Sequence, residues 1–267
     1  MFLTARARMA IRILAFIGLA FLYLPLGIVV MNAFNTSQTF EFPPPGFTTK
    51  WWNIAADDQG ARDGLIASLK AGLGATAIAL VLGTMAAFAV QRYKFFGRST
   101  ISFLVVLPIA LPGIVTGIAL KNAFTEVLAI DFSIWTIIIG HATFCVVIVF
   151  NNVQARLRRT GSSLEQASAD LGATGWQTFR YVTFPQLRGA LLAGALLAFG
   201  LSFDEIVVTN FTAPADVQTL PLWIFGNLFR PNQAPIVNVV AAVLIVVAVV
   251  PVWIAQKLTD DAAGSRF

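Results

Sequence analysis

The chain of 267 residues is strongly apolar and weakly charged: 57% of its residues are hydrophobic, 12% are charged, and its net charge is +5. A soluble domain carries about 25% charged residues, so this composition excludes a soluble globular protein and indicates one embedded in a membrane. Apolar runs of about 20 residues favour spanning helices over a barrel, whose strands are about 10 residues long and alternate in polarity.

Six segments reach or approach the roughly 20 apolar residues that a helix needs to cross a bilayer core. They are residues 11–34, 64–91, 100–120, 134–152, 188–210 and 236–256. Three arginines, Arg6, Arg8 and Arg12, stand at the start of the first segment, as in a signal peptide. Its apolar stretch exceeds the usual length of about 7–15 residues, however, and no small-residue cleavage motif follows it. We therefore expect it to be retained in an all-α integral membrane protein with six transmembrane helices in one domain, residues 1–267.

Basic residues are distributed unevenly between the two sides of these predicted spans. The N-terminal segment and the connections 92–99 and 153–188 hold eleven Lys and Arg, whereas the opposite connections hold four. Because short cytoplasmic loops carry the excess of positive charge, we predict a cytoplasmic N-terminus and, with six spans, a cytoplasmic C-terminus. Orientation accounts for the positive charge, and no nucleic-acid partner is expected.

The third span contains two prolines that disturb a helix. Pro108 and Pro112 lack a backbone donor and clash with the preceding turn, so the segment 100–120 is expected to bend or unwind. Membranes tolerate such breaks where neighbouring helices or a water-filled cavity satisfy the freed groups. A pathway-lining helix and a kink that serves packing both fit this pattern.

His141 is the only histidine of the chain and lies in the fourth predicted span. An intramembrane histidine can relay protons, but no second titratable residue lies near it in the sequence. We therefore expect His141 to be a hydrogen-bonded interior residue.

The fifth predicted span carries two adjacent carboxylates, Asp204 and Glu205. A carboxylate near the centre of a spanning helix costs about 2.5–3.5 kcal/mol on insertion scales, so such groups face a cavity or a partner. On a continuous helix Glu205 shares a face with Ser202 and Thr209. Pairing with an arginine or a backbone amide is one interpretation, and lining a route that attracts a cationic solute is the other. We favour the second, with Asp204, Glu205, Ser202 and Thr209 as pathway residues.

The long connection 153–187 has the pattern of two short helices on the cytoplasmic side. A hydroxyl residue among 160–163 caps the first helix, which has Glu165 in its first turn. Gly172 ends that helix in the left-handed conformation. A second short amphipathic helix follows, and Pro185 closes the connection before the fifth span.

Residues 166–185 read QAS-x3-G-x9-V-x-F-P. This pattern resembles the EAA loop of binding-protein-dependent ABC transporter permeases, which reads EAA-x3-G-x9-I-x-L-P. Gln166, Ser168 and Phe184 depart from that pattern, and Glu165 stands one residue before its acidic position. The stretches LPIALPGIVTGIAL and LSFDEIVVTNFTAP are also similar to this family, and the second most resembles its spermidine/putrescine-type members.

The resemblance implies the type I importer permease fold and a coupling loop at residues 162–185. The positions that correspond to the family's ATPase-coupling residues are Glu165, Gln166, Ala167, Gly172, Trp176, Phe179 and Pro185. The sequence has no G-x-x-x-x-G-K-[ST] phosphate loop, so ATP and Mg are expected on a separate dimer of ATP-binding subunits. No cofactor, metal or catalytic residue is expected on this chain.

Further partners are implied by the same resemblance. They are a second, homologous permease chain, an extracytoplasmic solute-binding protein and the lipid of a bacterial inner membrane. The function expected is uptake of polyamines or related cationic solutes, with no bond made or broken in this chain.

An alternative from another class is an ATP-independent secondary carrier or channel that uses Asp204 and Glu205 for proton coupling. Six spans alone permit such a protein, although the two-helix cytoplasmic connection has no obvious role in it. A membrane enzyme is a weaker idea, because the sequence has one His, one Cys and no cluster of metal-ligating residues.

Overall fold

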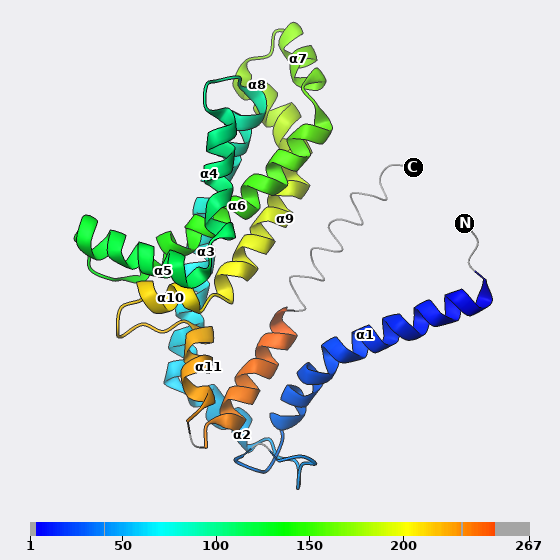
Figure 1. The fold of residues 1–267 in the computed structure, drawn as a ribbon, viewed down its shortest axis with the longest axis vertical. Helices are drawn as coiled ribbons and strands as arrows, with labels where there is room; N and C mark the ends of the chain where they lie inside the picture. Colours follow the sequence, from blue (N-terminus) through cyan, green and yellow to red (C-terminus); the bar gives the residue numbers. More distant parts are fainter. Residues whose placement is uncertain (1–3, 40, 231, 249–267) are drawn as a thin grey trace. The chain divides into compact units, whose positions relative to one another are not determined.

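The computed structural model describes residues 4–39, 41–230 and 232–248. Within them the regular structure is helical, apart from one isolated antiparallel bridge between Asn35 and Phe47 (Figure 1). The described residues fall into two compact units. Unit 1 joins the residues up to Arg62 to those from Ile224 onward, and unit 2 comprises Asp63–Trp223.

Unit 1 contains α1 (Ala5–Asn32), α2 (Lys50–Asp57), most of α11 (Leu220–Leu228) and a further helix, Ala234–Ala248. The loop between α1 and α2 is held by Trp51. Its indole Nε1 donates to the backbone oxygen of Asn35 at 2.8 Å, and its ring is buried. This tryptophan therefore has a packing role within unit 1.

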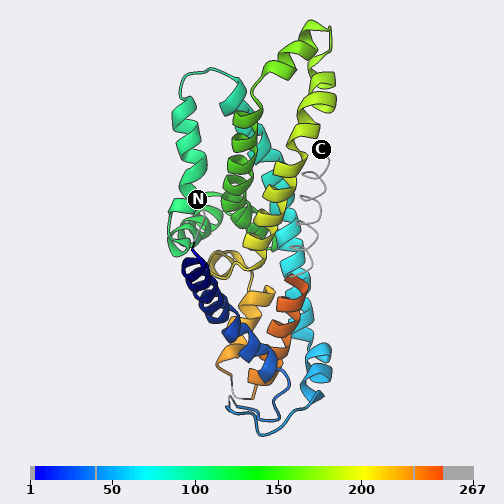
Figure 2. The same cartoon turned by 90° about the vertical axis from the view of Figure 1, so that its right-hand side faces the viewer.

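Unit 2 holds the remaining helices. They are most of α3 (Gln59–Arg92), then α4 (Arg98–Ala110), α5 (Gly113–Asn122), the π-helical turn η1 (Ala123–Val127), α6 (Ile134–Thr160), α7 (Ser163–Asp170), α8 (Gly175–Thr178), the π-helical turn η2 (Phe179–Thr183), α9 (Phe184–Phe203) and α10 (Val207–Thr212). Figures 1 and 2 both show α7 and α8 at one end of the α6 and α9 pair.

Helix α6 forms the centre of unit 2, and α9 packs along it. Phe150, Val153 and Leu157 of α6 are buried in the core. Helix α3 approaches α6 so closely that a Cβ atom on Gly83 would lie 2.8 Å from the backbone oxygen of Val146. Small residues permit this approach where helices meet inside a membrane.

Four helices are long and apolar enough to cross a bilayer. They are Arg6–Asn32, Gln59–Arg92, Ile134–Thr160 and Gly175–Phe203. These four overlap the first, second, fourth and fifth predicted spans, although the fifth differs at both ends. The sixth prediction, 236–256, begins in the helix Ala234–Ala248, and its end lies outside the described residues. The count of six spans stays a prediction.

The third predicted span is two helices, α4 and α5 with η1, which meet at an angle of 106°. Pro112 restricts the residue before it to an extended conformation, and Leu111 has φ −83° and ψ 144°. Pro112 itself then caps the start of α5, whereas Pro108 lies inside α4 without ending it. The predicted bend is confirmed, and the second proline sets its position.

The connection predicted at 153–187 is shorter than expected. Helix α6 continues to Thr160, and one helix runs from Gly175 to Phe203. Pro185 therefore does not close the connection. It lies inside that helix, as the second residue of α9, where its missing N–H removes one bond of the helical ladder. The π-helical turn η2 precedes it, with the amide of Phe184 bonded to the oxygen of Phe179 five residues earlier.

The fifth predicted span, 188–210, is also wrong as a continuous helix. Helix α9 ends at Phe203, and a short break separates it from α10. Asp204 caps the end of α9 with φ −90° and ψ 2°. The Glu205 carboxylate accepts the backbone N–H of Val208 at 2.8 Å, which satisfies a donor in the first turn of α10. The acidic pair thus ends one helix and begins the next.

Replacing Gly83 by Ala should lower the thermal stability of the protein, because the new methyl group meets the α6 backbone. Overpacking of this kind costs about 1–3 kcal/mol. Gly189→Ala is the matched control, since a Cβ atom there meets nothing within 4 Å. The melting temperature in detergent measures both effects. Equal melting temperatures for the two variants would contradict the close approach of α3 and α6.

Candidate functional site

The connection between α6 and the helix that starts at Gly175 is built by local capping. Gly172 has φ +82°, as predicted, and the amides of Gly172 and Ala173 bond back to the oxygens of Ala169 and Ser168 at 2.9 and 3.1 Å. This pair of bonds is the Schellman arrangement that terminates a helix at a left-handed glycine. Thr174 then opens α8 through a reciprocal capping box with Gln177.

Large apolar side chains remain exposed around this connection. Leu171 is 90% exposed and Trp176 is 68% exposed, with Leu164 and Tyr181 similarly open. We call these four residues the apolar tip. Exposed large apolar side chains near one another are typical of surfaces that bind another protein or a membrane.

Phe179 lies differently from Trp176, although both were predicted as coupling residues. Its ring contacts those of Trp176, Phe88 and Phe184, at centroid distances of 5.8, 6.0 and 6.1 Å. It is only partly exposed. Phe179 therefore packs against Trp176 and links the start of the helix Gly175–Phe203 to α3.

Glu165 faces into the protein. Its carboxylate forms an ion pair with Arg92, the last residue of α3, with Nε 2.9 Å from Oε2 and Nη2 donating to Oε1 at 3.0 Å. Thr183 of η2 donates to the same Oε1 at 3.1 Å. Neither Arg92 nor Thr183 was predicted as part of the site. The sequence could have indicated Arg92, because it is the one basic residue in the last turn of α3, next to the loop on the same side as the α7 connection.

The other predicted coupling residues are at the surface. Gln166 and Ala167 are exposed on α7, and the amide of Gln166 reaches only to the Ser162 hydroxyl within its own helix. Pro185 is exposed as well. The structure therefore separates Glu165, which is held inside the chain, from its neighbours, which face outward.

The predicted pathway residues divide in the same way. Asp204 is exposed and Glu205 is partly exposed at the break between α9 and α10. Ser202 and Thr209, which flank the break, are buried. These two hydroxyls contact His141 of α6, at 2.7 Å from Nδ1 to Ser202 and 2.9 Å from Nε2 to Thr209.

The two ring nitrogens of a neutral His141 take opposite roles, because one carries the proton and the other accepts. The hydroxyl of Thr209 donates to the backbone oxygen of Glu205 at 2.8 Å, so it accepts from Nε2 of the ring. Nδ1 then accepts from the hydroxyl of Ser202. The prediction that His141 is a hydrogen-bonded interior residue is confirmed. The histidine holds the two sides of the helix break together.

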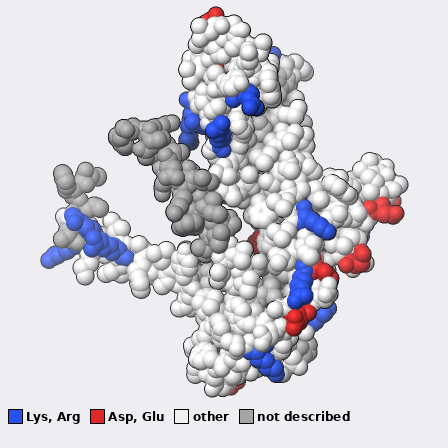
Figure 3. All heavy atoms as spheres, turned by 180° about the vertical axis from the view of Figure 1, so that it is seen from behind, with Lys and Arg blue, Asp and Glu red and all other residues white. Residues whose placement is uncertain are grey.

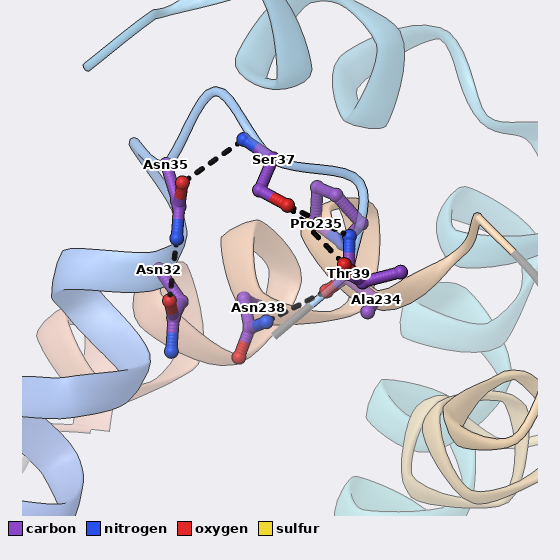
Figure 4. Close-up of a pocket in the computed structure, with 7 residues that line it drawn as sticks. All are labelled: Asn32, Asn35, Ser37, Thr39, Ala234, Pro235 and Asn238. Carbon is purple, nitrogen blue, oxygen red and sulfur yellow. Dashed lines mark hydrogen bonds between the residues drawn. The ribbon is translucent and has the colours of Figure 1, made fainter. Parts of the chain in front are cut away.

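A small polar hollow lies in unit 1, lined by Asn32, Asn35, Ser37, Thr39, Ala234, Pro235 and Asn238 (Figure 4). It offers about 10 Å³ to the centre of a water molecule, which is room for about one water. No elongated solute fits there. Among the described residues, no three His, Cys, Asp or Glu are grouped to hold a metal ion.

Helices of this length and apolarity define an integral membrane protein, and carboxylates beside a helix break are typical of those that conduct a solute. A model of the family of binding-protein-dependent transport system inner membrane components matches residues 79–261, and the chain belongs to this family. It is therefore a permease subunit of an ABC importer.

Three curated relatives match nearly the whole chain. The spermidine/putrescine transport system permease protein PotC of Escherichia coli (strain K12) is 31% identical, over 91% of this chain and 90% of that protein. The putrescine transport system permease protein PotI of the same strain is 30% identical, over 95% and 92%. A putative 2-aminoethylphosphonate transport system permease protein, PhnV of Salmonella typhimurium (strain LT2), is 30% identical, over 90% and 89%.

Two solved structures share the fold. A bacterial ABC transporter involved in the import of the acidic polysaccharide alginate matches with a TM-score of 0.71 and 16% identity, over 98% of this chain and 99% of that one. The MetNI methionine ABC transporter in inward-facing conformations matches with a TM-score of 0.60 and 15% identity, over 76% and 94%. Together with the family, they confirm the importer permease fold.

Removing the imidazole of His141 should destabilise unit 2. His141→Ala empties a buried site and leaves the Ser202 and Thr209 hydroxyls without their partner, at a cost of about 2–5 kcal/mol for a large-to-small change in a core. Thr143→Ala is the control on the same helix, because its hydroxyl bonds only to the Gly140 oxygen one turn earlier. Thermal unfolding in detergent compares the two. A His141→Ala variant as stable as Thr143→Ala would contradict the bridging role.

Proposed function

We propose that this permease imports polyamines or related cationic solutes across a bacterial inner membrane. The observation that carries the proposal is the exposed Asp204 beside the partly exposed Glu205 at the break between α9 and α10. Among the described residues, neither carboxylate forms an ion pair with a Lys or Arg of this chain. Their charge is therefore available to a cation from outside the chain.

The chemistry of the relatives' printed substrates supports an amine. Spermidine, putrescine and 2-aminoethylphosphonate differ in length and in their other groups, but all three carry a primary aliphatic amine that is protonated at neutral pH. An ammonium group is attracted by a carboxylate, and the attraction strengthens where water is partly excluded. Two adjacent carboxylates suit a solute with more than one ammonium group.

Ser202 and Thr209 support the pathway indirectly in this proposal. Both are buried against His141. They fix the ends of α9 and α10, so that Asp204 and Glu205 stay at the break, and the carboxylates themselves meet the solute.

The membrane arrangement proposed has six crossings with both termini in the cytoplasm. The bent pair of α4 and α5 supplies the third crossing and Ala234–Ala248 begins the sixth. Figure 3 shows Lys and Arg side chains gathered near the end of unit 2 that carries α7 and α8. An excess of basic residues marks the cytoplasmic side, so this end faces the cytoplasm.

The energy for transport comes from partner subunits that hydrolyse ATP. A dimer of ATP-binding subunits, which holds ATP and Mg, docks on residues 162–185 through the apolar tip, in the manner of an amphipathic helix that enters a groove. A second, homologous permease completes the solute route, and an extracytoplasmic binding protein delivers the solute. Membership of the family favours this importer over the proton-coupled carrier.

Removing both charges at the helix break tests whether the solute is a cation that these carboxylates attract. In the Asp204→Asn, Glu205→Gln double variant, uptake of putrescine or spermidine should fall about tenfold or more, because each tenfold loss needs only 1.4 kcal/mol of lost attraction. The Gln side chain keeps an oxygen for the Val208 amide, so the α10 cap survives. Asp131→Asn, at an exposed carboxylate of unit 2 outside the break, is the control. Unchanged uptake by the double variant, in a normally assembled complex, would refute the proposal.

Truncating Trp176 tests the docking surface. Aromatic anchors of an interface commonly cost 2 kcal/mol or more when replaced by alanine, so Trp176→Ala should reduce recovery of the ATP-binding subunit in a gentle-detergent pull-down. Trp135→Ala is matched in residue type and exposure, since the two rings are 64% and 68% exposed, but it lies at the other end of α6. Equal recovery with both variants would remove the apolar tip from the interface.

A further inference from the structure

The segment that docks on the ATP-binding subunit is loosely attached to the rest of unit 2. Helix α7 lies between two glycines with positive φ, Gly161 at +62° and Gly172 at +82°, and most of its residues are exposed. Its side-chain bonds to other helices are few. Ser168 meets Thr178 of α8 at 3.0 Å, and Glu165 makes the remaining contacts.

The ion pair of Glu165 and Arg92 joins α3, the turn into α7 and η2. Arg92 ends α3, Gly161 begins the turn into α7, and Thr183 belongs to η2 just before α9. Besides its ion pair with Glu165, Arg92 donates from Nη2 to the Gly161 oxygen at 2.6 Å. The side chains of Arg92 and Glu165 are 15% and 23% exposed, and Thr183 is buried.

We propose that Glu165 is a positioning residue, which transmits movement of the docking segment to α3 and α9 through Arg92 and Thr183. This inference rests on the proposed function, in which α7 and α8 receive the force of ATP hydrolysis. It assigns to Glu165 a role inside the chain. Contact with the ATP-binding subunit is left to its exposed neighbours.

The chemistry of the pair suits a rigid link. Arg92 Nη2 donates to both Glu165 Oε1 and the Gly161 oxygen, whereas Nε lies 2.9 Å from Oε2 without forming a hydrogen bond. The planar guanidinium thus orients two groups of the turn at once, which a lysine ammonium on its flexible stem does not reproduce. The ends of the helices add to it, because Arg92 lies in the last turn of α3 and Glu165 in the first turn of α7. Each charge is therefore favoured by the dipole of its own helix.

The link reaches two long helices of unit 2. Helix α3 packs on α6 at Gly83, and α9 ends at the acidic break. When Glu165 holds Arg92 and Thr183, a displacement of α7 moves the cytoplasmic ends of α3 and α9 together. Without these contacts, α7 rotates about Gly161 and Gly172, and its movement does not reach α3 or α9.

The test is a double-mutant cycle on the complete importer in liposomes. Glu165→Gln and Arg92→Gln should each raise the ATP hydrolysed per solute transported about tenfold, and the double variant should be no worse than either, because both changes break the same link. Asp170→Asn removes a carboxylate from the same helix, at an exposed position with no ion pair among the described residues, and should leave that ratio unchanged. All variants should still retain the ATP-binding subunit.

A second measurement on the isolated chain separates this inference from the proposed function. Hydrogen exchange of the amides of residues 163–170 should be about tenfold faster in Glu165→Gln and Arg92→Gln than in Asp170→Asn. Additive effects in the cycle, or equal exchange in the three variants, would overturn the link. Loss of the ATP-binding subunit from Glu165→Gln alone would show that Glu165 contacts it directly. Uptake by the unmodified complex without ATP would instead refute the importer proposal. The hydrogen-exchange result would then still show whether Glu165 and Arg92 hold α7 in place.

Discussion

A membrane core offers no water to an unpaired backbone group, and this constraint governs the two helix breaks of unit 2, between α4 and α5 and between α9 and α10. The breaks in its helices lie where side chains or prolines make them tolerable. At the break between α4 and α5, Pro112 has no N–H to satisfy. At the break between α9 and α10, Glu205 accepts the amide of Val208. His141 then ties the flanking hydroxyls together, so the opening does not spread along either helix.

The same constraint explains which features the sequence could reveal. Four long helices followed directly from runs of apolar residues, because a helix that crosses lipid needs little else. The bend of the third span followed from its prolines, and the left-handed turn at Gly172 from the absence of a side chain there. These are local effects, and each depends on one or two residues that a reader of the sequence can identify.

Features that depend on distant residues were missed or misread. The stripe of Ser202, Glu205 and Thr209 was recognised, but a continuous helix was assumed. Only the position of His141 on another helix shows that the hydroxyls bridge a break. The coupling role that the resemblance implies for Glu165 stays a prediction, but its partner Arg92 was missed, because it lies 73 residues earlier in the chain. Pro185 was read as a terminator because the π-helical turn that accommodates it leaves no clear pattern of its own.

One helix connects the two ends of the proposed mechanism. The segment Gly175–Phe203 has 29 residues, a length of about 44 Å at 1.5 Å per residue. It begins at the apolar tip, passes Thr183 beside Glu165, and ends at Asp204. A rigid helix of this length needs firm attachment at both ends if a push at one end is to move the other. The Glu165 link supplies the first attachment and the His141 bridge the second. In this proposal, the carboxylates at the far end change position when the docking segment moves, because one helix joins the two attachments.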